Sequence, residues 1–391
     1  MLFGRSPLAK RVLRTRLCDM LGIEYPILSA GMGPSLIGEE TGAPVELAVA
    51  VSEAGGLGVL GGAGYTVEEL RDRIREIRKL TDRPFGVDLL LPAQTVRAGD
   101  QPARSGGRVP LADALRALPK AHYEWLLKVK QELGLPDIEA TIGSGSTVSR
   151  PRAAVEVCIE EQVPLFCAGL GDPGFMVEAA HGVGMKVLGI AGNSKNAGRI
   201  ARSGADLVVA QGHEAGGHTG RVGSMALWPQ AIDAAAPTPV LAAGGIGDGR
   251  GVAAALAVGC VGVWVGTRFL SSDEGGALDI QKQAIVEATD EDTRRTYIYT
   301  GKTSRVTYNR FHDLWDESGL EPLPFPLQGL LASAMVDMFH RAGKREYVAP
   351  FAGQVSGLIH QIKPAGEIVQ DMVEEAADIL TRRLPESVEV R

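Results

Sequence analysis

The feature that most constrains this chain is a repeated alternation of short apolar runs, glycine-rich turns and alanine-rich helical stretches. Such alternation is typical of a parallel sheet with helical crossovers. Eight runs fit the pattern, at residues 26–30, 57–60, 84–90, 163–168, 186–190, 206–210, 239–243 and 261–265. Eight strand–helix units predict an α/β fold of the closed (β/α)8 type, the TIM barrel, and a doubly wound open sheet is the alternative.

Two segments interrupt this rhythm. Residues 91–150 form an insertion after the third strand, and they include an amphipathic helical piece. Residues 276–347 are expected to be helical and interrupted by prolines. The last stretch, "PAGEIVQDMVEEAADILTRRL", has apolar residues at helical spacing, with Glu early and Arg late, which suits the helix dipole. We therefore expect a barrel over 17–275, a smaller helical domain over 276–347, and a segment over 348–391 that returns to the barrel.

Composition excludes some classes of function. The net charge of −7, from 40 basic and 47 acidic side chains, gives no overall field that favours nucleic acid. No apolar run is long enough to span a bilayer, so no membrane partner is expected. The four cysteines lack the CxxC spacing of a zinc site and favour a reducing cytoplasm as the compartment.

Glycine clusters follow several of the expected strands, at the barrel end where ligands bind. The loops after strands seven and eight are the usual position of a bound phosphate in this fold. These loops contain "GGIGDG" and "GTRF". Gly244, Gly245, Gly266 and Thr267 therefore predict a phosphate cradle, with ordinary tight turns as the alternative.

The segment "QGHEAGGHTG" after strand six supplies the candidate reactive group. Gly216 and Gly217 would let a flat ligand lie against the backbone. His218 would then lie beside that ligand, where an imidazole can exchange a proton near neutral pH. His213 is interpreted as a neighbour. Glu214 is either a base or an anchor for the loop through backbone N–H groups.

A metal site is the alternative for the same segment. Its two histidines and one glutamate could bind zinc, but they lack the helical HExxH spacing that places both imidazoles on one face. A zinc hydrolase is therefore a minor alternative, and no metal is expected.

The motifs also resemble a known family. "QGHEAGGHTG" and "LAAGGIGDGRGVAAALAVGCVGVWVGTRFL" resemble the nitronate monooxygenase family, formerly called 2-nitropropane dioxygenases. The same superfamily includes FMN-dependent enoyl-ACP reductases and NAD(P)H:quinone reductases. "LGIEYPILSAGMG", "TDRPFGVDLL", "YTGKTSR" and "PFAGQVSGLI" extend the resemblance over most of the chain. The insertion and parts of 310–347 lack it.

The resemblance implies a TIM barrel that holds FMN, with the helical domain capping the substrate. It implies that His218 is the catalytic residue. The cofactor-binding residues that it implies are Ala30, Gly31, Met32, Asp88, Gln211, Gly216, Gly217, Gly244, Gly245, Gly266 and Thr267.

The chain departs from the family pattern at a few positions. Gly31 replaces a proline that often precedes Met32, and Asp88 stands where many members have Asn. An ionised Asp can only accept hydrogen bonds, so Asp88 is expected to be either reoriented or protonated beside a flavin edge that needs donors. Lys195 is the expected equivalent of a lysine that some members place near the flavin.

Three flavin reactions fit these residues. We expect oxidation of a nitronate or nitroalkane with O2. The alternatives are reduction of an enone, enoyl thioester or quinone, with NADH or NADPH as the reductant, and a non-catalytic flavin-binding protein. The partner is a small-molecule substrate in each enzymatic case. The segment "EPLPFPLQGLLASAMVDM" is expected to form either an apolar lid or the interface of a homodimer.

Overall fold

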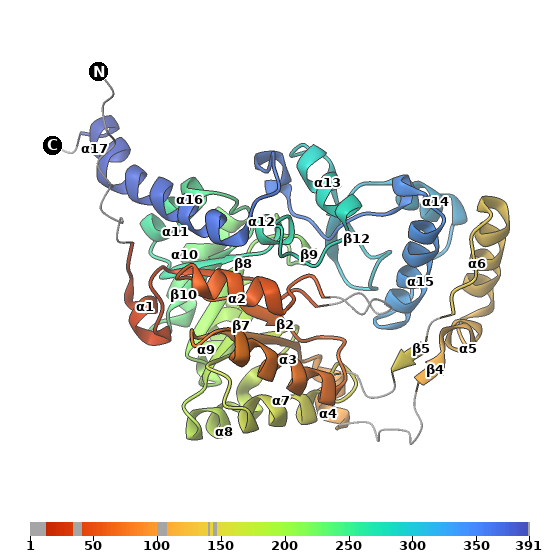
Figure 1. Cartoon of the computed structure of the whole chain (residues 1–391), viewed down its shortest axis with the longest axis horizontal. Coiled ribbons are helices and arrows are strands. Elements are labelled where there is room, and N and C mark those ends of the chain that lie inside the picture. The colour runs from red at the N-terminus through yellow and green to blue at the C-terminus, as the bar shows by residue number, and fades with distance from the viewer. Residues whose placement is uncertain (1–12, 34–40, 100–107, 140, 144–146, 390–391) are drawn as a thin grey trace.

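A computed structural model describes residues 13–33, 41–99, 108–139, 141–143 and 147–389. Eight parallel strands form its main sheet, shown on the left of Figure 1. They are β1 (Ile27–Ser29), β2 (Val59–Gly61), β3 (Gly86–Leu90), β6 (Leu165–Gly169), β7 (Lys186–Ala191), β8 (Leu207–Gln211), β10 (Val240–Ala243) and β11 (Gly262–Val265). Each of the eight runs predicted from the sequence overlaps one of these strands, and four of the strands extend one residue beyond the predicted run.

The sheet closes on itself. Its strand order is β1-β11-β10-β8-β7-β6-β3-β2, and the two outer strands meet through a parallel bridge between Leu28 and Leu57. The Leu57 N–H donates to Ile27 O at 3.0 Å, and the Ser29 N–H donates to Leu57 O at 3.1 Å. The prediction of a closed (β/α)8 barrel is therefore confirmed, and the open sheet is excluded.

Helices cover the outside of the barrel (Figure 1). They are α2 (Val45–Glu53), α3 (Val67–Leu80), α7 (Pro151–Glu160), α8 (Val177–Gly182), α9 (Ser194–Arg202), α10 (Ser224–Ala235), α11 (Gly249–Val258) and α16 (Ala365–Asp378). Helix α3 shows why such segments are helical: a capping box joins Thr66 and Glu69, and Leu70, Ile74 and Ile77 form its buried stripe. Helix α16 packs against α2 and α11.

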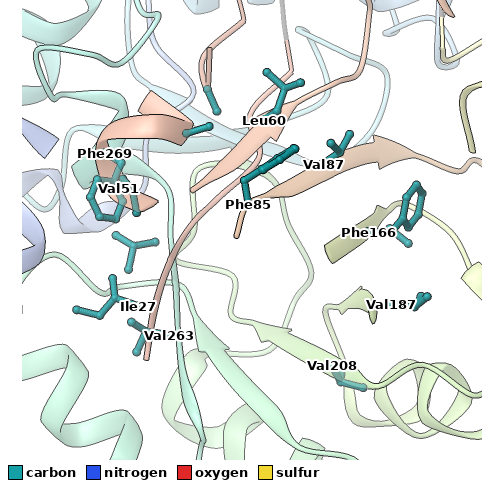
Figure 2. Packing of buried hydrophobic residues seen from close by; sticks show 14 of the residues in the cluster. Ile27, Val51, Leu60, Phe85, Val87, Phe166, Val187, Val208, Val263 and Phe269 are labelled. Atoms are coloured by element: carbon teal, nitrogen blue, oxygen red, sulfur yellow. The ribbon is translucent and has the colours of Figure 1, made fainter. Parts of the chain in front are cut away.

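Strand side chains alternate between two cores. On β6, Leu165 and Cys167 belong to a cluster inside the barrel, whereas Phe166 and Ala168 belong to the layer between strands and helices. This follows from the period of two residues along a strand. Figure 2 shows the outer layer around Phe85 and Val263. Helix α1 (Arg16–Leu21) contributes Leu17 and Cys18 to the inner cluster.

A second lobe lies beside the barrel, on the right of Figure 1. Its core joins α5 (Leu111–Arg116) and α6 (Lys120–Leu133) of the insertion to segments from the C-terminal third. The insertion also contains α4 (Ala93–Ala98), β4 (Arg108–Pro110) and β5 (Thr141–Gly143). The C-terminal third contributes α13 (Asp279–Glu287), β12 (Thr293–Thr296), β13 (Ser304–Thr307), α14 (Arg310–Ser318) and α15 (Leu327–Arg341). A short helix, α17 (Leu384–Ser387), follows α16.

The segment 276–347, expected to be helical, contains an antiparallel hairpin made of β12 and β13. Its sequences "TRRT" and "SRVT" are rich in β-branched residues and lack the spacing of an amphipathic helix, which explains the strands. The hairpin pairs with the short strand β9 (Gly217–His218) from the loop after β8. The second lobe thereby touches the candidate site directly.

None of the helices in the described part of the chain is long and apolar enough to cross a membrane. The domain bounds given above remain a prediction.

Candidate functional site

At the C-terminal ends of the strands, the barrel interior is lined by small or polar groups. Below it, the inner core is filled by large side chains such as Leu165, Leu188 and Val209. One step further along the strands, the alternation brings Ala30, Asp88 and Gln211 to the same inner side. The barrel interior therefore ends at its C-terminal face in a floor of small and polar side chains.

Gly31 and Asp88 are in direct contact on this floor. A Cβ atom on Gly31 would overlap the Cβ atom of Asp88 and would lie 3.0 Å from its Cγ. Asp88 is buried, and its Oδ1 has no hydrogen-bond partner among the described residues. Burial raises the pKa of Asp88 well above its ordinary value, and the backbone of Gly169 opposes this only in part. Of the two sequence expectations for Asp88, the structure favours the protonated form, which can donate a hydrogen bond.

The ends of β1 and β11 form one continuous surface. The Ala30 N–H donates to Val265 O at 2.8 Å. A Cβ atom on Gly266 would lie 3.7 Å from Ala30 Cβ and 4.0 Å from Met32 Sδ. A side chain at position 266 would therefore be in van der Waals contact with both groups.

The predicted phosphate cradle has suitable geometry. Gly244 and Gly245 have φ of +93° and +73°, values that favour glycine. A Cβ on Gly245 would meet no atom within 4 Å, and no acceptor among the described residues pairs with its N–H. Thr267 begins the short helix α12 (Thr267–Leu270), so its N–H has no partner within the helix. Its hydroxyl accepts from Gly353 N at 3.0 Å, which leaves the hydroxyl proton free to donate.

The loop after β8 is held in place from two sides. Gln211 Nε2 donates to His218 O at 2.7 Å, and His218 pairs with Ser304 of β13. Gly216 packs so closely on Ala352 that a Cβ atom would lie 2.7 Å from the carbonyl carbon of that residue. Gly217 has φ of +70° and open space where a Cβ would be. Gly217 is thus the glycine of this pair that leaves room for a ligand.

His213 and Glu214 are engaged elsewhere. The Glu214 carboxylate accepts from Ser224 N at 3.0 Å and from Ser224 Oγ at 3.1 Å, so it anchors the loop to α10. His213 O accepts from Arg305 Nε at 3.0 Å. In the part of the chain that the structure describes, no three His, Cys, Asp or Glu side chains gather as they would around a metal ion.

The hydrogen bonds around His218 define its tautomer. The Thr300 hydroxyl lies 3.0 Å from His218 Nε2 and donates its single proton to Lys302 O at 3.1 Å. With that proton on Lys302 O, Thr300 Oγ1 accepts from His218, an arrangement that corresponds to the tautomer with the proton on Nε2 and a lone pair on Nδ1. Burial and, after it, the charge of Lys302 lower the pKa of His218 from 6.5 to about 4. The ring is neutral at pH 7 and able to accept a proton at Nδ1.

Two further side chains border the histidine. The Phe325 ring meets the His218 ring edge-on, with the ring centroids 6.3 Å apart. Lys302 Nζ lies 5.0 Å from the centroid of the same Phe325 ring. Sequence reasoning assigned no role to Thr300 or Lys302, although "YTGKTSR" was among the matching motifs, and it placed Phe325 only in the expected lid or interface segment. Lys195, the expected flavin lysine, is exposed on α9.

Comparison with known proteins gives a consistent set of relatives. The family model described as nitronate monooxygenase matches residues 14–375. The protein named "Putative monooxygenase Rv1533" from Mycobacterium tuberculosis is 35% identical over 381 residues, which cover 94% of this chain and 97% of the relative.

Two solved structures are similar along nearly the whole chain. The nitroalkane oxidase of Streptomyces ansochromogenes is 30% identical with a TM-score of 0.76, and the match covers 93% of this chain and 99% of the other. FabK from Thermotoga maritima is 32% identical with a TM-score of 0.72, and the match covers 96% of this chain and 100% of the other. Both structural matches therefore extend over the second lobe as well as the barrel.

Proposed function

The chain belongs to the nitronate monooxygenase family, and from this premise we propose that it is an FMN-dependent oxidoreductase that oxidises nitronates or nitroalkanes with O2. The observation that carries the proposal is the placement of a neutral His218, with Nδ1 free to accept a proton, at a barrel mouth lined by glycines. A named nitroalkane oxidase among the similar structures supports the choice of substrate.

The residues at the mouth fit FMN. The N–H groups of Gly245 and Thr267 would hold the phosphate, because unpaired backbone N–H groups at a helix N-terminus favour anions. Ala30, Met32 and Gly217 border the space for the flat ring, and a protonated Asp88 would donate to its polar edge. Bound FMN would supply the redox chemistry, taking electrons from the substrate.

The contribution of the protein is binding and proton handling. A nitroalkane must lose the proton next to its nitro group before it is oxidised, and Nδ1 of His218 is the atom that would take it. Thr300 fixes the ring in the tautomer that this step needs. Gln211 holds the backbone of His218 and so keeps the ring above the floor.

The proposal is tested by anaerobic bleaching of the flavin. Denaturation of the purified protein should first release one FMN per chain, identified by mass. Nitroethane or propionate-3-nitronate alone should then bleach the flavin, and O2 should restore its colour. Bleaching by NADH or NADPH but by neither nitro compound would instead assign an enone or quinone reductase. A protein that binds no flavin would refute the proposal.

We also propose a cytoplasmic compartment and a role for the segment around α15. The four cysteines are free and buried, as they would be in a reducing cytoplasm. The segment around α15 remains proposed as a lid or homodimer interface. Size-exclusion chromatography with light scattering separates these two roles.

A further inference from the structure

Among the described residues, no acid balances the cation beside His218. Lys302 is partly buried, and burial alone lowers the pKa of its ammonium group. No carboxylate of the described residues forms an ion pair with it, and its close neighbour is the Phe325 ring. Burying a charge is costly unless a partner balances it, so a half-buried ammonium in this place calls for an anion.

The charge belongs to a cationic segment. Residues 293–307, which form the hairpin of β12 and β13, contain four basic residues and no acidic one. Arg294 pairs with Asp316, and Arg305 donates to His213 O and to Thr293. Lys302 is left with an aromatic face, which binds a cation more weakly than a carboxylate does.

Lys302 is also tied to the reacting histidine. The backbone N–H of Lys302 donates to Thr300 Oγ1 at 3.2 Å, and the Lys302 carbonyl accepts from the same hydroxyl. That hydroxyl also forms the hydrogen bond with His218 Nε2. The edge-on contact between His218 and Phe325 places both side chains around one ring. Both side chains therefore border Phe325, and the charge of Lys302 acts on the imidazole.

We propose that Lys302 is a substrate-binding residue that receives the negatively charged group of an anionic, nitronate-type substrate beside His218. This inference rests on the proposed function and narrows it, because it selects anionic nitronates over neutral nitroalkanes and enones as the preferred substrates. Phe325 holds the ammonium group through a cation–π contact, and an arriving anion would replace this contact with a charge-assisted one.

The first test uses nitrate, a planar monoanion with the shape of a nitronate group, and needs no turnover. Wild-type holoenzyme should bind nitrate, as followed by the change in flavin absorbance. Lys302→Met should weaken this binding about 10- to 100-fold, the range for a lost hydrogen bond to a charged group. Lys302→Arg should restore most of it. Lys128→Met removes an exposed lysine of α6 and is the matched control.

The second test uses steady-state kinetics. Lys302→Met should raise KM for propionate-3-nitronate at least 10-fold while changing KM for neutral nitroethane by no more than about twofold. Unchanged nitrate affinity in Lys302→Met, or no binding of nitrate to wild type, would overturn the role of Lys302. If nitrate binding depends on Lys302 but no nitro compound is oxidised, the anion site stands and the proposed oxidation fails.

Discussion

The backbone of Gly31 rests directly on the side chain of Asp88, so tightly that a Cβ at position 31 would overlap the Asp88 Cβ atom. Both residues are positions at which the sequence resemblance leads us to expect a departure from the family pattern. Their contact shows that the two departures belong to one local arrangement, in which the lack of a side chain at position 31 accommodates the buried acid at position 88.

The contact makes Gly31→Ala destabilising. The added methyl group must push Asp88 or the end of β1 aside, and overpacking of this kind costs about 1–3 kcal/mol. Urea denaturation measures the change. The double variant Gly31→Ala/Asp88→Gly removes the overlapping atom and should recover part of the loss. Gly182→Ala is the control, since a Cβ there would meet nothing within 4 Å. A Gly31→Ala variant as stable as this control would show that Asp88 and the end of β1 can shift at little cost in free energy.

Asp88→Asn should stabilise the protein at neutral pH. The pKa of Asp88 is raised in the folded state, so the folded chain holds a proton that the unfolded chain releases above about pH 4. Each pKa unit of this rise lowers the free energy of unfolding of the wild-type protein by about 1.4 kcal/mol once the pH exceeds the pKa of Asp88 in the folded state. The amide has no such cost and keeps a donor for the flavin. Thermal unfolding at pH 4 to 8 should show a gap in Tm that widens with pH, whereas a constant gap would mean that Asp88 does not titrate.

The eight strands were predictable because each one leaves a local signal, a short apolar run that in seven of the eight cases is followed within two residues by glycine. The glycine loops of the proposed cradle could be located for the same reason, since Gly244 and Gly266 directly follow β10 and β11. The partners of His218 left no such signal. Thr300, Lys302 and Phe325 come from a hairpin and a loop more than 80 residues away, and only the pairing of β13 with β9 brings the hairpin to His218.

Sequence reasoning also gave Gly216 and Gly217 the same role. The structure gives them different roles. The backbone of Ala352 lies too close to Gly216 for any side chain at that position, whereas Gly217 faces open space. Close approach of a distant backbone cannot be recognised from a pair of adjacent glycines. The same limit applies to the short distance between Gly31 and Asp88.

Gly245→Asp should leave a folded protein that lacks FMN. The new carboxylate would occupy the open space of the cradle and repel a phosphate. Its left-handed backbone also costs about 1–2 kcal/mol for any residue with a Cβ. Gly319→Asp is the matched control, because Gly319 has φ of +65° and open space but lies at the end of α14. Flavin absorbance per chain measures the outcome, and full occupancy in Gly245→Asp would place the phosphate elsewhere.

Thr300→Val should disturb the tautomer of His218 without removing the ring. Loss of the acceptor at Nε2 leaves both nitrogens free to carry the proton, so part of the population would lose the lone pair at Nδ1. Nitroethane oxidation should fall about 10-fold, on the scale of one neutral hydrogen bond. Thr300→Ser should keep wild-type behaviour. The ¹⁵N chemical shifts of the imidazole report the tautomer, and wild-type shifts in Thr300→Val would contradict the assignment.

The low pKa of His218 sets the acid limit of activity. Because the ring stays neutral down to about pH 4, kcat/KM for nitroethane should remain level from pH 7 to about pH 5, instead of falling below pH 6.5 as it would for an ordinary histidine. Removal of the charge in Lys302→Met should move this limit upward. A wild-type profile that falls with an apparent pKa of 6.5 would place His218 in a much wetter environment.

Substitution of His218 separates proton removal from the other steps. His218→Ala should keep FMN, because the cradle is built from Gly245 and Thr267, and nitroethane oxidation should fall about 10²- to 10⁴-fold, the range for a lost general base. His218→Asn can donate a hydrogen bond but cannot take up a proton at neutral pH. It should therefore retain much of the activity on propionate-3-nitronate, which arrives already deprotonated, and lose the activity on nitroethane. Stopped-flow absorbance of the flavin follows the reductive half-reaction with each substrate separately. Equal losses on both substrates would mean that His218 orients the substrate without removing its proton, and wild-type rates in His218→Ala would exclude it from the reaction.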